Sequence, residues 1–153
     1  MKKLKIVLIF TFLILFNHNA MSKNISSIYD HTFVDIDGNN IDLSKFRGNP
    51  LLLVNTASRC GFTYQYEGLQ NLFINYRDTD LTIIATTSNS FNQEYGTSEE
   101  IKKICLVNYN VGFLISNPIN VKGDNIHPIY KWIKDEYKKG PNWNFYKYLF
   151  DRN

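Results

Sequence analysis

The sequence predicts a single α/β domain built around parallel strands. A chain of 153 residues, 44% apolar and 20% charged, is the size and composition of one globular domain with a real core. Residues 51–54 are an uninterrupted apolar run, as in a strand buried on both faces. Residues 64–76 then follow a helical period, and 81–85 form a second apolar strand. This strand–helix–strand order predicts a right-handed βαβ unit.

Residues 1–20 have the layout of a secretory signal peptide. Three lysines precede the apolar run 6–16, and Ala20 stands at a candidate cleavage point. Eleven residues are too few to span a bilayer as a relaxed helix. We therefore expect export to the periplasm or the medium.

The mature domain is then expected to comprise residues 21–153. Because His18 stands where a small residue is preferred, two alternatives remain: an uncleaved membrane anchor, and a cytoplasmic product that starts at Met21. Removing residues 1–20 takes away three lysines and no acids, so the formal charge falls from +3 to 0. Without a basic excess, nucleic-acid binding is not expected.

The remaining elements follow from turn and capping signals. Residues 32–34 and 41–43 read as short strands around an Asp-Gly-Asn-Asn turn, which predicts an N-terminal β-hairpin. Thr97 and Glu100 form a capping box that begins a helix. His127-Pro128 is expected to begin another helix, and residues 148–150 read as a strand.

Cys60 occupies the turn between the first apolar strand and the helix that follows it. Parallel α/β folds place reactive groups at the carboxyl ends of strands. The start of a helix favours a thiolate, because its N–H groups and dipole stabilise negative charge. The alternative is that Cys60 is a small buried residue without chemistry. From position alone, both interpretations stay open.

Cys105 is the second of two cysteines. It lies on one helical stripe with Ile101 and Ile104, so periodicity alone favours a buried structural role over a redox role. His31 and His127 have no ligand spacing with each other or with a cysteine, so we expect no metal site. Nothing local suggests a Cys/His nucleophile.

Five segments, among them SSIYDHTFVDIDGNNIDLSKFRG at 26–48 and INVKGDNIHPIYKWIK at 119–134, resemble the cysteine-containing branch of the glutathione peroxidase family. VNTASRCGFTYQYEGLQNL at 54–72 is similar to its peroxidatic motif, and SNSFNQEYGTSEEIKKIC at 88–105 and NWNFYKYLFDRN at 142–153 continue the likeness. The resemblance covers residues 26–153 in the family's order. It implies a thioredoxin-like fold, in which helices flank a central mixed sheet and a β-hairpin comes first.

The same resemblance implies a set of site residues. Cys60 would be the peroxidatic cysteine, with Gln93, Trp143 and Asn144 completing a tetrad around it. Amide and indole N–H groups are donors that stabilise negative charge as the peroxide oxygen leaves. Cys105 would be the resolving cysteine, which condenses with oxidised Cys60 once its helix has unwound locally.

The implied activity is that of a thiol peroxidase in the oxidative stress response. It would act as a monomer on hydrogen peroxide or organic hydroperoxides, with thioredoxin or glutathione as reductant and with neither cofactor nor metal. Two alternative functions are consistent with the same residues: a peroxide-sensing thiol–disulfide relay, and a catalytically impaired remnant.

Two departures from the family pattern favour the remnant. The segment 91–96 is one residue short and has Tyr95 where proline is usual, which predicts a displacement of Gln93 by about 3 Å. The sequence also stops after the strand 148–150, where the family continues with a strand and a helix. We therefore expect an open sheet edge and a less covered apolar face.

Overall fold

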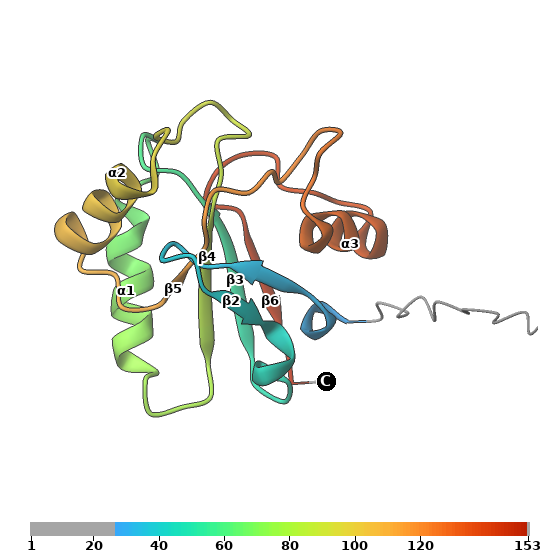
Figure 1. Cartoon of the computed structure of the whole chain (residues 1–153). Helices are drawn as coiled ribbons and strands as arrows, with labels where there is room; N and C mark the ends of the chain where they lie inside the picture. The colour runs from blue at the N-terminus through green and yellow to red at the C-terminus, as the bar shows by residue number, and fades with distance from the viewer. Residues whose placement is uncertain (1–26, 153) are drawn as a thin grey trace, which may run out of the picture.

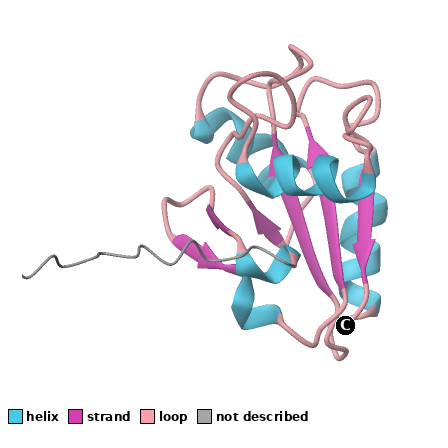
Figure 2. Ribbon diagram, turned by 90° about the vertical axis from the view of Figure 1, so that its right-hand side faces the viewer, coloured by secondary structure: helices cyan, strands magenta, loops and turns pink. Residues whose placement is uncertain are grey.

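The computed structural model describes residues 27–152, which form a mixed sheet with helices on both faces and a separate β-hairpin (Figures 1 and 2). The predicted signal peptide lies outside the described residues. No helix in the described part of the chain has the length and apolar character needed to cross a membrane. The elements in chain order are η1 (Ile28–Asp30), β1 (Thr32–Val34), β2 (Asn40–Asp42), η2 (Leu43–Phe46), β3 (Leu51–Thr56), α1 (Gln65–Asn75), β4 (Thr82–Thr87), α2 (Ser98–Lys102), η3 (Lys103–Asn108), β5 (Leu114–Ile115), α3 (Pro128–Tyr137) and β6 (Lys147–Phe150).

The main sheet has the strand order β5-β4-β3-β6. β3 and β4 are parallel, with Leu51 opposite Thr82, and β4 is parallel to β5. β6 is antiparallel to β3, which makes the sheet mixed as predicted. β6 stands at the end of the strand order, so the expected open edge is present among the described residues. Its Leu149 side chain is 72% exposed, in agreement with the expected poorly covered apolar face.

The predicted N-terminal hairpin is confirmed, with a small correction. β1 and β2 pair antiparallel, and Val34 lies opposite Asn40. The second strand ends at Asp42, because the Asp42 carboxylate accepts a hydrogen bond from Ser44 N (2.9 Å) and begins η2 there. The predicted strand therefore began and ended one residue too late.

The apolar run of β3 is explained by helices on both sides of the sheet. Leu52 and Val54 pack in the core beneath α1 and α2, whereas Leu51 and Leu53 pack in the core beneath α3. Figure 1 shows α1 and α2 on one side of the sheet and α3 on the other, and Figure 2 shows α3 crossing in front of the strands. The residues that follow β3 leave the sheet between these layers.

The helix predicted at 64–76 is α1, and its buried side differs slightly from the prediction. Tyr66 and Leu69 are buried, and Leu72 is partly buried and packs against the same core. Tyr76, the last apolar residue of the predicted helical period 64–76, lies just past the helix and is 49% exposed. The apolar stripe was therefore extended one turn too far.

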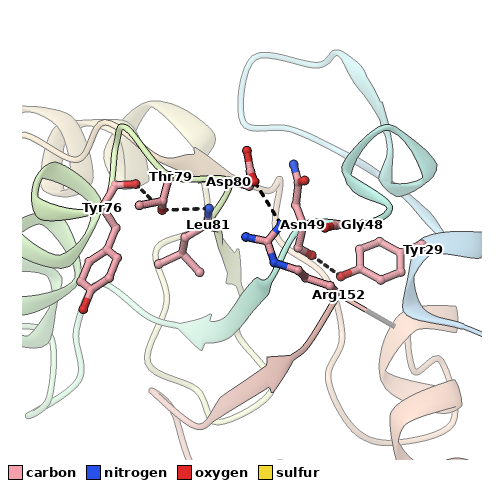
Figure 3. A network of polar contacts seen from close by, with 8 residues as sticks. All are labelled: Tyr29, Gly48, Asn49, Tyr76, Thr79, Asp80, Leu81 and Arg152. Atoms are coloured by element: carbon pink, nitrogen blue, oxygen red, sulfur yellow. Dashed lines mark hydrogen bonds and ion pairs between the residues drawn. The ribbon is translucent and has the colours of Figure 1, made fainter.

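A polar network ties the sheet together at the end where β3 and β4 begin (Figure 3). Arg152, just after β6, donates to the Gly48 carbonyl (3.3 Å) and to the Asp80 carboxylate (3.0 Å). Tyr29 OH donates to the Asn49 carbonyl (2.5 Å), just before β3, and the Asp151 carbonyl is a second, longer acceptor (3.0 Å). Because β3 and β4 are parallel, both strands finish at the other end of the sheet. That end carries Cys60.

Candidate active site

Cys60 lies in a turn that several hydrogen bonds hold in place. Its backbone N–H donates to Thr63 Oγ1 (3.1 Å), and its carbonyl accepts from Thr63 N (3.0 Å). Phe62 N lies 3.4 Å from Cys60 Sγ and donates to it, and the residue is only 8% exposed. An N–H directed at sulfur stabilises negative charge that develops there. The predicted position of Cys60, between strand and helix, is confirmed.

Thr63 was not singled out from the sequence, although a detectable signal was present. It is buried, and its hydroxyl donates to the Ala57 or Cys60 carbonyl (2.9 and 2.7 Å) as well as accepting from Cys60 N. Threonine just before a helical period is a typical capping residue. Here its side chain fixes the shape of the Cys60 turn.

The loop that contains Gln93 is docked onto this turn. Arg59 N donates to the Gln93 carbonyl (2.9 Å), and Ser58 N donates to Glu94 Oε1 (3.0 Å). The Arg59 guanidinium also lies over the Tyr95 ring, 5.6 Å from its centre, in a cation–π contact. The shortened loop, with tyrosine in place of the expected proline, is therefore attached to the Cys60 turn by backbone and side-chain contacts.

Gln93 and Asn144 meet across this site. Asn144 Nδ2 donates to Gln93 Oε1 (2.9 Å), Asn144 is 4% exposed and Gln93 is half-buried. The structure thus brings together two of the three predicted partners of Cys60. Within the described residues, Cys60 Sγ accepts its hydrogen bond from Phe62 N and none from Gln93, Trp143 or Asn144.

The structure does not bring Trp143 to the sulfur in the same way. Its ring packs against Phe91, with 5.2 Å between ring centres, and the residue is 44% exposed. Within residues 27–152, its indole N–H donates no hydrogen bond. Trp143 therefore lines the surface next to Asn144, and its predicted role is not visible in these contacts.

Asn55 places the Trp143–Tyr146 segment, and the sequence analysis missed it. Asn55 is fully buried in β3; its carbonyl accepts from Phe145 N (2.6 Å), its Nδ2 donates to the Trp143 carbonyl (3.1 Å) and its Oδ1 accepts from Tyr146 N (3.1 Å). Phe145 has a left-handed backbone (φ 62°) within this segment. A polar residue inside an apolar strand was the available signal, since buried amides require partners.

Cys105 has a very different environment. It is completely buried in the core between the sheet and α1, as its periodicity predicted, whereas Ile104 is only half-buried. Burial raises the pKa of the Cys105 thiol from 9.0 to about 11; the neighbouring Tyr66 hydroxyl opposes this shift and the Glu94 carboxylate adds to it. The resting Cys105 is therefore a neutral thiol at physiological pH.

The segment that carries Cys105 is a π-helix. The predicted helix start is confirmed, because Glu100 N donates to Thr97 Oγ1 (3.3 Å) and α2 begins there. The return contact of the capping box differs, since the Glu100 carboxylate accepts from the Thr97 hydroxyl (2.9 Å). After α2, the chain widens into the six-residue segment η3 (Lys103–Asn108). Such segments are rare, and they occur frequently at functional sites.

Both cysteines are free thiols, and both belong to the same core. Among residues 27–152, no three His, Cys, Asp or Glu side chains gather where they could hold a metal ion. His127 accepts a hydrogen bond from Ile129 N (3.3 Å) at the start of α3, as expected, and burial lowers its pKa.

Comparison with known proteins matches this chain to the family that its sequence motifs resemble. The family model for glutathione peroxidase matches residues 28–134. The chain is 43% identical over 132 residues to "Glutathione peroxidase-like peroxiredoxin gpx1" of Schizosaccharomyces pombe and 39% identical over 132 residues to a "Glutathione peroxidase" of Lactococcus lactis; each alignment covers 83% of this chain and 84% of the relative.

A solved structure supports the fold as well. The crystal structure of "Trgpx" in its apo form matches with a TM-score of 0.64 and 32% identity, over 83% of this chain and 79% of that one. The likeness confirms the thioredoxin-like fold, with its mixed sheet and flanking helices. The residues around Cys60, the match to the family model and these relatives together show that the chain belongs to the glutathione peroxidase family.

Proposed function

We propose that this protein is a thiol peroxidase that reduces hydrogen peroxide or organic hydroperoxides through Cys60. Family membership supports the reaction class. The observation that carries the proposal for this chain is the assembled site: Phe62 N points at Cys60 Sγ, and the turn is docked to the loop whose Gln93 pairs with Asn144.

In the first step, the Cys60 thiolate attacks the distal peroxide oxygen. A sulfur–oxygen bond forms and the oxygen–oxygen bond breaks, which leaves Cys60 as a sulfenic acid. The departing oxygen takes up a proton and leaves as water or an alcohol. We assign the amide groups of Gln93, on the loop docked to the Cys60 turn, and of Asn144, which pairs with it, to stabilise this oxygen.

In the second step, we assign Cys105 as the resolving thiol. Its sulfur attacks the Cys60 sulfenic sulfur, the disulfide forms and the hydroxyl leaves as water. Because Cys105 is fully buried in η3, that segment must open before the sulfurs meet. Thioredoxin or glutathione would then reduce the disulfide by thiol–disulfide exchange.

Steady-state turnover tests the proposal and identifies the reductant. The full chain is given hydrogen peroxide with either thioredoxin, its reductase and NADPH, or glutathione, its reductase and NADPH. Peroxide-dependent NADPH oxidation that is absent in Cys60→Ser would support the peroxidase. Oxidation of Cys60 without turnover in either system would favour a sensing relay, and no oxidation of Cys60 would contradict the proposal.

We also propose, on residue pattern alone, that residues 1–20 direct export of residues 21–153. Expression in a bacterial host, followed by fractionation and N-terminal sequencing, tests this. A periplasmic product that begins at residue 21 is expected. A cytoplasmic or membrane-retained product would contradict cleavage.

A further inference from the structure

Tyr95 stands where proline is usual, in a loop that is one residue short. A proline has no backbone N–H, whereas Tyr95 N donates to Glu94 Oε1 (2.9 Å). A proline also has no aromatic ring, whereas the Arg59 guanidinium lies over the Tyr95 ring, 5.6 Å from its centre. The departure from the family pattern therefore supplies two contacts that the usual residue cannot make.

These contacts belong to a set that joins the loop to the residues just before the cysteine. Ser58 N donates to the same Glu94 Oε1 (3.0 Å), and Arg59 N donates to the Gln93 carbonyl (2.9 Å). Ser58 and Arg59 directly precede Cys60, and Glu94 is only 5% exposed. The loop is thus held on both sides of Glu94 by the two residues that lead into the peroxidatic turn.

The Tyr95 ring is itself held in place. It is half-buried and packs against the core that contains both cysteines. Arg59, by contrast, is exposed, so the contact with the ring is the printed restraint on its guanidinium among the described residues. A ring supported by the core therefore gives the Arg59 side chain a fixed partner.

Within the loop, other hydrogen bonds keep the short segment compact. Asn89 O accepts from Asn92 N (2.9 Å), and Asn89 Oδ1 accepts from Glu94 N (3.1 Å). Asn92 has a left-handed backbone (φ 58°), which asparagine adopts more readily than most residues. These bonds close the loop but do not reach the Cys60 turn. Its attachment to that turn comes from residues 58 and 59.

We propose that Tyr95 and Arg59 are positioning residues, which hold the shortened loop so that the Gln93 amide keeps its place at the Cys60 turn. The inference rests on the proposed function, in which Gln93 and Asn144 stabilise the departing oxygen. Gln93 lies two residues before Tyr95, and a misplacement of about 1 Å can cost about 10²-fold in rate. Tyr95 would thus offset the loss of one residue from the loop.

The rate of Cys60 sulfenic acid formation tests this in the full chain, measured by dimedone trapping and intact mass after one equivalent of hydrogen peroxide. Tyr95→Ala removes the ring and should slow this step about tenfold. Tyr95→Phe keeps a ring for Arg59 and should stay within about twofold of wild type. Tyr76→Ala, at a 49% exposed tyrosine just past α1, is the matched control and should leave the rate unchanged.

Tyr95→Pro is the most discriminating single change. It introduces the residue that is usual in the family, yet it removes both the N–H that Glu94 accepts and the ring that Arg59 covers. In this short loop it should slow sulfenic acid formation at least as much as Tyr95→Ala does. A rate equal to or above that of wild type in Tyr95→Pro would overturn the inference.

A double-mutant cycle with Gln93→Ala tests whether Tyr95 acts through the Gln93 amide. Gln93→Ala alone should slow oxidation of Cys60 by about 10²-fold, because a donor to the departing oxygen is lost. Adding Tyr95→Ala should then slow it by less than about twofold, because the group that Tyr95 positions is already absent. A general loosening of the structure would instead slow both backgrounds equally, and that result would overturn the inference.

A second cycle separates the contact of Arg59 from its charge. Arg59→Met keeps the backbone N–H to Gln93 and removes the guanidinium, so it should slow the reaction in the wild-type background but not in Tyr95→Ala. Equal slowing in both backgrounds would mean that the charge acts directly on the reaction, which would overturn the role given to the contact. Arg59→Lys keeps a cation for the ring and should restore most of the rate.

The remaining outcomes also decide. A wild-type rate in Tyr95→Ala would overturn the inference while the proposed function stands. If Tyr95→Ala does not fold, Arg59→Met, at an exposed side chain, takes its place, and a wild-type rate there would overturn the inference. If wild-type Cys60 forms no sulfenic acid at all, the proposed function itself fails.

Discussion

Cys60 lies in a turn held by backbone and threonine hydrogen bonds, whereas Cys105 lies in a six-residue π-helical segment. Both belong to the core between the sheet and α1. Cys60 is 8% exposed and its sulfur receives an N–H, while Cys105 is fully buried and its thiol pKa is raised to about 11. The same residue type thus has a sulfur that receives an N–H hydrogen bond in one place and is a fully buried, neutral thiol in the other.

The difference agrees with the roles that we propose for the two cysteines. A nucleophile needs fixed neighbours when the peroxide arrives, and the hydrogen bonds of Thr63 fix the Cys60 turn. A resolving thiol in the core must move before it reacts, and Cys105 lies in a π-helical segment, which is less regular than an α-helix. Substitutions in one region can therefore be compared with substitutions in the other.

The largest effect is expected from removing each sulfur in turn. Cys60→Ser should slow peroxide consumption by about 10³-fold or more, because no other group is placed to act as the nucleophile. Cys105→Ser should leave the rate of the first step unchanged and halt the reaction at the sulfenic acid. Stopped-flow measurement of peroxide loss compares the two, and equal loss of the first step would contradict the division of roles.

The donors beside Cys60 are expected to matter next. Asn144→Ala removes the amide that pairs with Gln93 and should slow oxidation of Cys60 by about 10²-fold, since the departing oxygen loses a donor. Asn142→Ala, at an exposed neighbouring position, is the control and should have little effect. An unchanged rate in Asn144→Ala would remove Asn144 from the site.

Burial of Cys105 should be visible in stability against pH. Its pKa is raised on folding, from 9.0 to about 11, so its stabilising contribution is complete below about pH 9 and is lost as the pH rises to about 11. Over that range, wild type should lose about 2–3 kcal/mol relative to Cys105→Ala. Urea unfolding under reducing conditions measures this, and parallel curves for the two proteins would contradict the buried neutral thiol.

The smallest effect is expected from loosening each helix by one glycine. Lys103→Gly, at an exposed position of η3, costs helical structure about 0.7–1 kcal/mol and should therefore speed disulfide formation about three- to fivefold. Asn71→Gly is the corresponding change in α1 and should not speed it. Quenched oxidation time courses compare both variants, and equal acceleration would show that opening is not confined to η3.

The features that were predictable depend on regular periods. The apolar run of β3 and the helical period of α1 predicted the βαβ unit and the place of Cys60, and the i, i+3, i+4 stripe predicted that Cys105 is buried. The hairpin and the start of α2 followed from turn and capping residues.

The features that were missed depend on contacts between distant segments. Asn55 makes four hydrogen bonds to residues 143–146. A polar residue in an apolar strand indicates that partners exist, but the sequence does not show which segment supplies them, and it does not report the packing of Trp143 on Phe91 either. The π-helix adds a residue to one turn, which side-chain periodicity at this length does not report. No feature of the sequence distinguishes Glu94 from an exposed acid in a loop, whereas the structure shows that it is buried.

The order of oxidation tests the central claim most directly. The reduced full chain is mixed with one equivalent of hydrogen peroxide, quenched from milliseconds to minutes and mapped by peptide mass spectrometry. We predict that sulfenic acid appears first on Cys60 alone, and that a Cys60–Cys105 disulfide follows at a slower rate set by the opening of η3. Oxidation that appears first on Cys105, or two thiols that both survive the exposure, would contradict this account.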